Sequence, residues 1–241
     1  MNTIEIFILL IMAFLPAIIY AIWIRNTEKY NREKWKPIII CFLWGASVAI
    51  IASLMLEILL GTIVIVSIQD TSWILFFMVV VIAPFVEELT KPLALSLKSV
   101  RKELDEPEDG LIYGAVAGLG FSATENLFYG YDAFVTQGIL FFFILMAIRS
   151  FAGCLLHASA TAWTGYGYGK YILRRSKFSR VIPYFLLAIL IHALYNFLPV
   201  FGTNLSLGIG FFAAILLVVL TIYVVRKKIM QLDRAAGENI L

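Results

Sequence analysis

The sequence predicts an all-α fold, a polytopic membrane bundle of about seven transmembrane helices with its N-terminus outside and its C-terminus in the cytoplasm. Three observations support this. Of the 241 residues, 61% are hydrophobic and 15% are charged, with a mean hydropathy of +0.92. Soluble domains carry roughly half apolar and about a quarter charged residues. The apolar excess falls into runs of membrane-spanning length, and basic residues collect in alternate connectors.

The first apolar run, residues 4–24, is expected to be a retained membrane helix. It has the length of roughly 20 residues that a span needs, and it lacks the basic leader and cleavage site of a signal peptide. Because the third and fifth of the seven runs exceed the bilayer thickness, we expect them to tilt or protrude. One domain, 1–241, is predicted, with its motifs in about 80–200. The later spans are 37–60, 72–97, 110–130, 138–169, 181–199 and 206–225.

Basic residues set the expected orientation. Of the 19 Lys and Arg residues, 17 lie in the first, third and fifth connectors and the C-terminal tail. Since cytoplasmic loops are enriched in Lys and Arg, we expect those segments inside and a multi-pass protein of the plasma membrane. The net charge of +3, without a basic patch away from the membrane, argues against nucleic acid as a partner. Cys41 and Cys154 lie in apolar runs and are interpreted as inert buried thiols.

Ionisable side chains inside the spans indicate a functional site. Each one near the bilayer centre is unfavourable by about 2.5–3.5 kcal/mol on insertion scales. Glu57 has no companion motif and is interpreted as structural or supporting. The spans hold eight such residues: Glu57, Glu87, Glu88, Lys91, Glu125, Arg149, His157 and His192.

The third span contains tandem glutamates followed by a lysine. Glu87 and Lys91 are four residues apart and Glu88 and Lys91 three, so either carboxylate can reach the ammonium group. One glutamate is expected to pair with Lys91 while the other points into a cavity as a general base for water. The alternative is an ion pair that only locks two helices, but the neighbouring Pro84 and Pro92 favour function.

The fourth span carries small residues at four-residue steps. Gly110, Gly114 and Gly118 predict close packing between membrane helices. Glu125 lies deep in the same span without a basic residue on its own helix. Its role is therefore expected to be functional.

The fifth and sixth spans contain both histidines. Arg149 and His157 lie on a second small-residue stripe, which favours a functional His157 over a satisfied core histidine. His192 and Asn196 are four residues apart and could donate together to an oxyanion, worth about 2.7–4 kcal/mol per donor. The alternative is an interhelical hydrogen bond, worth under about 1–2 kcal/mol.

These motifs together resemble the PrsW family of intramembrane proteases, which looks related to the type II CAAX prenyl proteases and the bacterial CPBP proteins. The most specific part runs from Asp105 to Gly114 and on to Asn126. The resemblance covers about half of the chain. It rests on Glu87-Glu88-x-x-Lys91, Phe121-x-x-x-Glu125-Asn126, His157 and His192-x-x-x-Asn196.

The resemblance implies a role for each catalytic residue. Glu87 would activate water, and Glu88 would orient it or pair with Lys91. His192 and Asn196 would stabilise the oxyanion. The prenyl proteases have histidine where this chain has Glu125, so either Glu125 or His157 assists Glu87; we favour His157, held by Glu125. Residues expected to bind substrate or support the site are Lys91, Phe121, Asn126 and Arg149.

Metal dependence stays open at this point. Members of the family are described as metalloproteases, but the H-E-x-x-H motif is absent and no two histidines share a helix. We therefore expect no cofactor and keep Zn²⁺ as the alternative. Its ligands would be His157, His192, Glu87 and Glu125.

The leading hypothesis is an intramembrane endopeptidase that acts on a transmembrane or membrane-anchored protein within the lipid bilayer. The resemblance implies an anti-sigma-factor-like substrate. A proton- or ion-coupled transporter could use the same carboxylates as relays, but transporters usually show repeated halves, which this sequence lacks. A catalytically silent scaffold that holds a partner helix is the third hypothesis.

Overall fold

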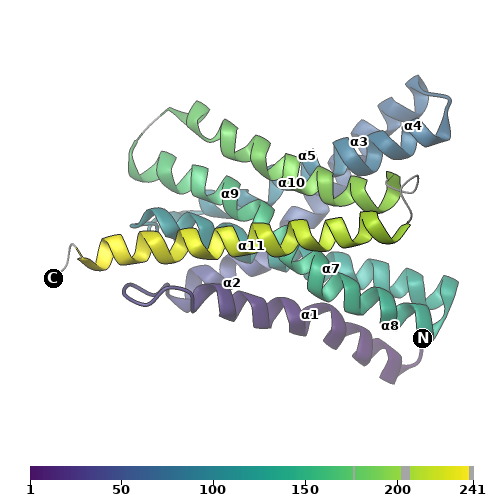
Figure 1. Cartoon of the computed structure of the whole chain (residues 1–241), viewed down its shortest axis with the longest axis horizontal. Helices are drawn as coiled ribbons and strands as arrows, with labels where there is room; N and C mark the ends of the chain where they lie inside the picture. Colours follow the sequence, from purple (N-terminus) through teal and green to yellow (C-terminus); the bar gives the residue numbers. More distant parts are fainter. Residues whose placement is uncertain (176, 202–206, 239–241) are drawn as a thin grey trace.

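The structure is a computed structural model that describes residues 1–175, 177–201 and 207–238. Every regular element in these ranges is helical, which confirms the predicted all-α bundle (Figure 1). Irregular π-helical or 3₁₀ turns join several helices into longer rods. The α-helices are α1 (Thr3–Arg25), α2 (Trp35–Trp44), α3 (Ile50–Ser67), α4 (Thr71–Phe76), α5 (Ala83–Thr90), α6 (Lys98–Arg101), α7 (Pro107–Gln137), α8 (Ile139–Ile148), α9 (Cys154–Leu173), α10 (Ile182–Phe201) and α11 (Leu207–Glu238).

Six helical rods in the described residues are long and apolar enough to cross a membrane, so the chain is a multi-pass integral membrane protein. The second rod runs to Ser67, beyond the expected end at 60, and α11 continues well past 225. The expected start of the last span, residue 206, lies outside the described residues. The six rods are Thr3–Arg25, Trp35–Ser67, Thr71–Ser96, Ile139–Leu173, Phe178–Val200 and Gly208–Ala236.

The helix α7 accounts for the difference between six apolar rods and the expected seven spans. It has 31 residues, long enough to cross a bilayer. Every residue from 108 to 123 is buried against neighbouring helices. A helix surrounded by protein needs no apolar face toward lipid, so its Gly- and Ala-rich composition is less hydrophobic. Seven crossings remain a prediction that depends on α7.

The glycine stripes of α7 and α9 pack against each other, as predicted. A Cβ atom on Gly118 would collide with the carbonyl oxygen of His157, and one on Gly114 with that of Thr161. Gly110 and Gly165 exclude each other's Cβ in the same way. This close approach brings Glu125 of α7 next to His157 of α9.

Irregular helical turns adjoin the ionisable residues of the rods. The π-helical segments η2 (Phe77–Ile82) and η4 (Arg149–Gly153) precede α5 and α9, and the 3₁₀ segment η3 (Lys91–Ser96) begins at Lys91. A further π-helical segment, η1 (Gly45–Ala49), joins α2 to α3. Such turns inside helices are frequent at functional sites because they change the direction of side chains.

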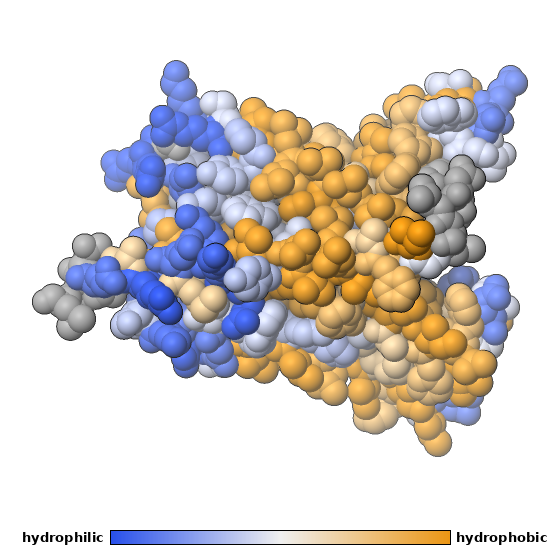
Figure 2. Space-filling model, in the orientation of Figure 1, coloured by the Kyte–Doolittle hydropathy of each residue, from blue (hydrophilic) through white to orange (hydrophobic). Residues whose placement is uncertain are grey.

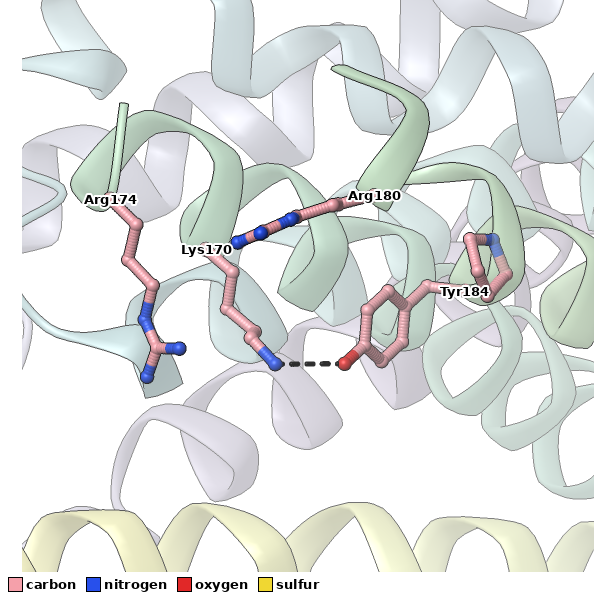
Figure 3. A pocket seen from close by; sticks show the side chains of 5 residues that line it. Lys170, Arg174, Arg180 and Tyr184 are labelled. Atoms are coloured by element: carbon pink, nitrogen blue, oxygen red, sulfur yellow. Dashed lines mark hydrogen bonds between the residues drawn. The ribbon is translucent and has the colours of Figure 1, made fainter. Parts of the chain in front are cut away.

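One end of the bundle is strongly hydrophilic. The connector 26–34 and the C-terminus lie there, away from the N-terminus, and a hydrophobic region covers the middle of the molecule (Figures 1 and 2). At this end Lys170, Arg174 and Arg180 line a pocket of about 260 Å³, where the Lys170 ammonium donates to the Tyr184 hydroxyl over 2.9 Å (Figure 3). This grouping of basic connectors agrees with the alternation expected from sequence, and the cytoplasmic assignment of this end remains a prediction.

Candidate active site

Lys91 is the centre of a buried polar network. Its Nζ donates to Glu87 Oε2 over 2.8 Å and to Glu88 Oε1 over 2.9 Å, and it contacts His157 Nδ1 at 2.8 Å. The ammonium also lies 4.3 Å from the centre of the Phe121 ring. Both glutamates therefore pair with Lys91, whereas the sequence led us to expect one pair and one free carboxylate. The spacing of three and four residues permits both contacts on one helical turn.

The two glutamates nonetheless differ in their surroundings. Glu88 is fully buried, and its Oε2 accepts a hydrogen bond from Thr161 Oγ1 over 2.8 Å. Its Oε1 lies 3.0 Å from His192 Nδ1. Glu87 is 5% exposed and lines a cavity. Of the pair, Glu87 is the carboxylate that a water molecule can reach.

Hydrogen bonds fix which nitrogen of His157 carries a proton. The Lys91 ammonium can only donate, so His157 Nδ1 accepts. The opposite atom, Nε2, then carries the hydrogen and donates to Glu125 Oε2 over 2.9 Å. A neutral His157 thus turns its Nδ1 toward Glu87, whose Oε2 lies 3.7 Å away.

Glu125 has the basic partner that its own helix lacks. Arg149 Nη2 lies 2.7 Å from Glu125 Oε2, and its Nε donates to Asn126 Oδ1 over 2.8 Å. The guanidinium also lies 3.8 Å from the centre of the Tyr129 ring. The π-helical turn η4 places Arg149 there from the neighbouring rod. Arg149, which also binds Asn126, therefore holds the carboxylate that in turn holds His157.

His192 and Asn196 were expected to donate together to an oxyanion, but their hydrogen bonds in the structure give a different arrangement. The Glu88 carboxylate accepts from His192 Nδ1, so in the neutral ring Nε2 has a lone pair and no hydrogen to donate. That Nε2 lies 4.0 Å from Glu87 Oε2. Asn196 Nδ2 donates one hydrogen to the carbonyl oxygen of Val79 over 2.9 Å. Because an amide nitrogen carries two hydrogens, one remains for another acceptor.

Two neighbouring cavities meet at Glu87. The larger, about 370 Å³, is lined by Glu87, Glu125, His157, His192 and Asn196 among others. The smaller, about 290 Å³, lies toward Ile50, Leu54 and Phe128. Residues that line both are Glu57, Ala83, Glu87, Glu125 and Tyr129.

Sequence reasoning missed two residues of this site, Tyr129 and Thr161, and gave a third, Glu57, only a supporting role. Glu57 was given a structural or supporting role, yet it lines both cavities. Tyr129, one turn after Glu125, also lines both, and Thr161 binds Glu88. The charge of Glu57 inside a span was a usable signal, whereas Tyr129 and Thr161 belong to types that are common in membrane helices.

Three of the cavity residues have the donor atoms of a catalytic zinc site. One ligand atom each from Glu87, His157 and His192 lies within 4.8 Å of the others. Two histidines and one carboxylate form a known catalytic zinc set, and each ring gives its other nitrogen to a carboxylate, as zinc-binding histidines do. Glu125 binds the far nitrogen of His157, so the four expected ligands reduce to three. Zinc binding would require Lys91 to release Glu87 Oε2 and His157 Nδ1.

Comparison with known proteins gives a family match for most of the chain. Residues 33–225 match the family described as PrsW family intramembrane metalloprotease. A curated protein of Clostridioides difficile (strain 630), Protease PrsW, is 33% identical over 122 residues, which cover 50% of this chain and 50% of that protein. The matched part thus spans about half the length of that relative. Comparison with solved structures gave no significant match.

Proposed function

Because this chain belongs to the PrsW family of intramembrane metalloproteases, we propose that it is an endopeptidase that cleaves a transmembrane or membrane-anchored protein. One observation carries the proposal. Glu87 combines access to a cavity with contacts to Lys91 and two imidazoles, inside a bundle of membrane-length helices. The family match gives no support to the transporter hypothesis.

In the proposed reaction Glu87 acts as the general base. It takes a proton from a water molecule in the cavity while the water oxygen attacks the peptide carbonyl carbon. The proton then passes to the amide nitrogen as the C–N bond breaks, and a carboxylic acid and an amine result. A positioned acid–base group of this kind contributes about 10²–10⁴-fold to a rate.

The neighbours of Glu87 have separate tasks in this proposal. Lys91 keeps the carboxylate ionised and oriented. Neutral His157, held by Glu125, presents Nδ1 beside Glu87 and assists the proton transfer. The free hydrogen of Asn196 Nδ2 is the first candidate for the oxyanion, and His192 Nε2 can join it only when the ring carries two protons.

A zinc-dependent route is the second candidate, favoured by the family description and by the set of Glu87, His157 and His192. Zinc held there would supply Lewis-acid polarisation and an acidified water. The contacts His157–Glu125 and His192–Glu88 would orient both rings toward it. In this route Lys91 must turn away from Glu87.

The proposed substrate follows from the resemblance and the membrane setting. An anti-sigma-factor-like protein of the plasma membrane, cleaved in regulated proteolysis, is the class that the resemblance implies. The apolar wall of the smaller cavity, formed by Ile50, Leu54 and Phe128, suits a membrane-derived peptide segment.

The test is cleavage of a panel of single-pass membrane proteins by the purified chain in proteoliposomes. We expect Glu87→Gln to lose activity by about 10²-fold or more. The control is Asp132→Asn, because Asp132 is an exposed carboxylate on α7, and this variant should leave the cleavage activity unchanged. Equal cleavage by wild type and Glu87→Gln would refute the proposed role of Glu87. Cleavage that survives a strong zinc chelator supports the glutamate route, and cleavage lost and restored by Zn²⁺ supports the metal route.

A further inference from the structure

A second cluster of carboxylates lies at the hydrophilic end, away from the network of Lys91. It joins the connector 26–34 to the first turn of α7 and to α11. The cluster contains part of the Asp105–Gly114 stretch, the most specific part of the sequence, which the proposed reaction does not use. Its members are Glu28, Glu33, Glu106, Glu108, Asp109 and Asp233.

One part of the cluster is satisfied by hydrogen bonds. Glu28 Oε2 accepts from the backbone N–H of Glu33 over 3.0 Å. Asp109 Oδ2 accepts from the backbone N–H groups of Asp105 and Glu106, each over 2.8 Å. The Tyr113 hydroxyl donates to Glu33 Oε2. These contacts explain Glu33 and Asp109 without any ligand.

The other part has oxygen atoms without partners. Glu28 Oε1, Glu106 Oε2 and both carboxylate oxygens of Glu108 are buried and lack a hydrogen bond within the described ranges. Glu28 and Glu108 are 0% exposed. A buried carboxylate without a donor or a counter-charge is strongly unfavourable. The unpartnered oxygens all belong to the three residues that form one group of ligand atoms within 4.8 Å of one another.

From this geometry we propose that Glu28, Glu106 and Glu108 bind a hard divalent cation, Ca²⁺ or Mg²⁺. Carboxylate oxygens are the ligands these ions prefer, and Ca²⁺ holds them at about 2.3–2.6 Å, so oxygens on opposite sides lie about 5 Å apart. The absence of histidine and cysteine from the trio disfavours zinc. The site is therefore chemically distinct from the one formed by Glu87, His157 and His192.

Cation binding would tie together segments far apart in the chain. Glu28 belongs to the connector that follows α1, and Glu106 and Glu108 begin α7, which carries Glu125. Asp233 of α11 accepts from the backbone of Lys29 over 2.9 Å, which fixes the same connector from the other side. The ion is thus placed to stabilise α7, whose Glu125 contacts His157, and it does not touch the reacting atoms.

The test uses the full chain in detergent with Glu87→Gln in every sample, so that active-site metal cannot contribute. We expect Ca²⁺ or Mg²⁺ at millimolar concentration to raise the thermal midpoint by several degrees over EDTA, and separate arms show which ion acts. Adding Glu108→Gln or Glu28→Gln should remove the shift. Adding Asp105→Asn, an exposed residue of the same motif, should preserve it.

Equilibrium dialysis of the Glu87→Gln chain with ⁴⁵Ca²⁺ gives a direct readout that needs no further variant. Retention of one ion per chain, or its displacement by Mg²⁺, supports the site. No retention together with identical midpoints in EDTA and in both cations overturns it. A shift that persists undiminished in both Glu28→Gln and Glu108→Gln also overturns it. Because Glu87 is disabled throughout, neither result depends on proteolytic activity.

Discussion

His157 Nε2 lies 2.9 Å from Glu125 Oε2, and this contact between α9 and α7 determines the chemistry of the ring. A carboxylate can only accept, so the hydrogen of a neutral His157 stays on Nε2 and the lone pair of Nδ1 faces Lys91 and Glu87. Glu125 therefore acts on Glu87 through the imidazole between them. The tight glycine packing of the two helices sets the position of this contact.

Replacing Glu125 by Gln tests this relationship. We expect the rate of cleavage at saturating substrate to fall about 10–100-fold, the usual effect of losing a carboxylate behind a histidine. The Michaelis constant should change little, because Glu125 orients His157 rather than binding the peptide. Steady-state kinetics, with Asp132→Asn as control, separates an effect on the rate from an effect on the Michaelis constant. A purely structural role would instead reduce folded protein at unchanged specific activity.

Lys91 is predicted to be essential for stability as well as activity. Lys91→Met leaves Glu87 and Glu88 without their buried cation, and removal of one partner of a buried pair destabilises by about 3–5 kcal/mol. Thermal unfolding in detergent measures the effect. The double variant Lys91→Met, Glu88→Gln should recover part of the loss. If it is no more stable than Lys91→Met, the loss does not come from the uncompensated charge of Glu88.

Gly118 offers a purely steric prediction. In Gly118→Val the new side chain meets the carbonyl oxygen of His157, and overpacking of this kind is destabilising by about 1–3 kcal/mol. The matched control is Gly208→Ala, because a Cβ there meets nothing within 4 Å. The unfolding midpoints should fall for Gly118→Val only. Equal midpoints would show that α7 and α9 can separate without loss.

The connector carboxylate Glu33 predicts a pH dependence. Burial raises its pKa from the ordinary 4.5 to about 7, so the folded state favours the neutral acid. The corresponding stability is present in full below about 4.5 and is lost as the pH rises through about 7. In EDTA the thermal midpoint should therefore fall between these values, and Glu33→Gln should flatten the fall. An unchanged slope in Glu33→Gln would assign the dependence to other groups.

The sequence predicted much of the fold because membrane spans have a local signal. Apolar runs located the rods to within a few residues at most ends. Four-residue glycine steps predicted close packing between membrane helices, and the structure shows that the partners are α7 and α9. The lower hydropathy of α7 reflects its place inside the bundle, which a single sequence does not reveal. The end of the second rod at Ser67 was missed because the apolar run continues without a charge to mark it.

The candidate site was less predictable because its geometry depends on pairs far apart in the chain. The residue types and their helices followed from the motifs, but the contact of Arg149 with Glu125 joins separate rods. The tautomers of His157 and His192 follow from hydrogen bonds that spacing does not encode. The cluster around Glu28 likewise needs the connector and the start of α7 to meet.

The position of Glu87 between two cavities has a consequence for how substrate and water reach it within the bilayer. In the proposed reaction, a peptide beside Leu54 and Phe128 would approach the carboxylate from an apolar cavity, while the polar side chains of Asn196 and Arg149 would suit water in the other cavity. The hydrophobic substrate and the water molecule then reach Glu87 by separate routes. Such a partition would let hydrolysis proceed in a lipid environment without opening a continuous aqueous leak along the substrate.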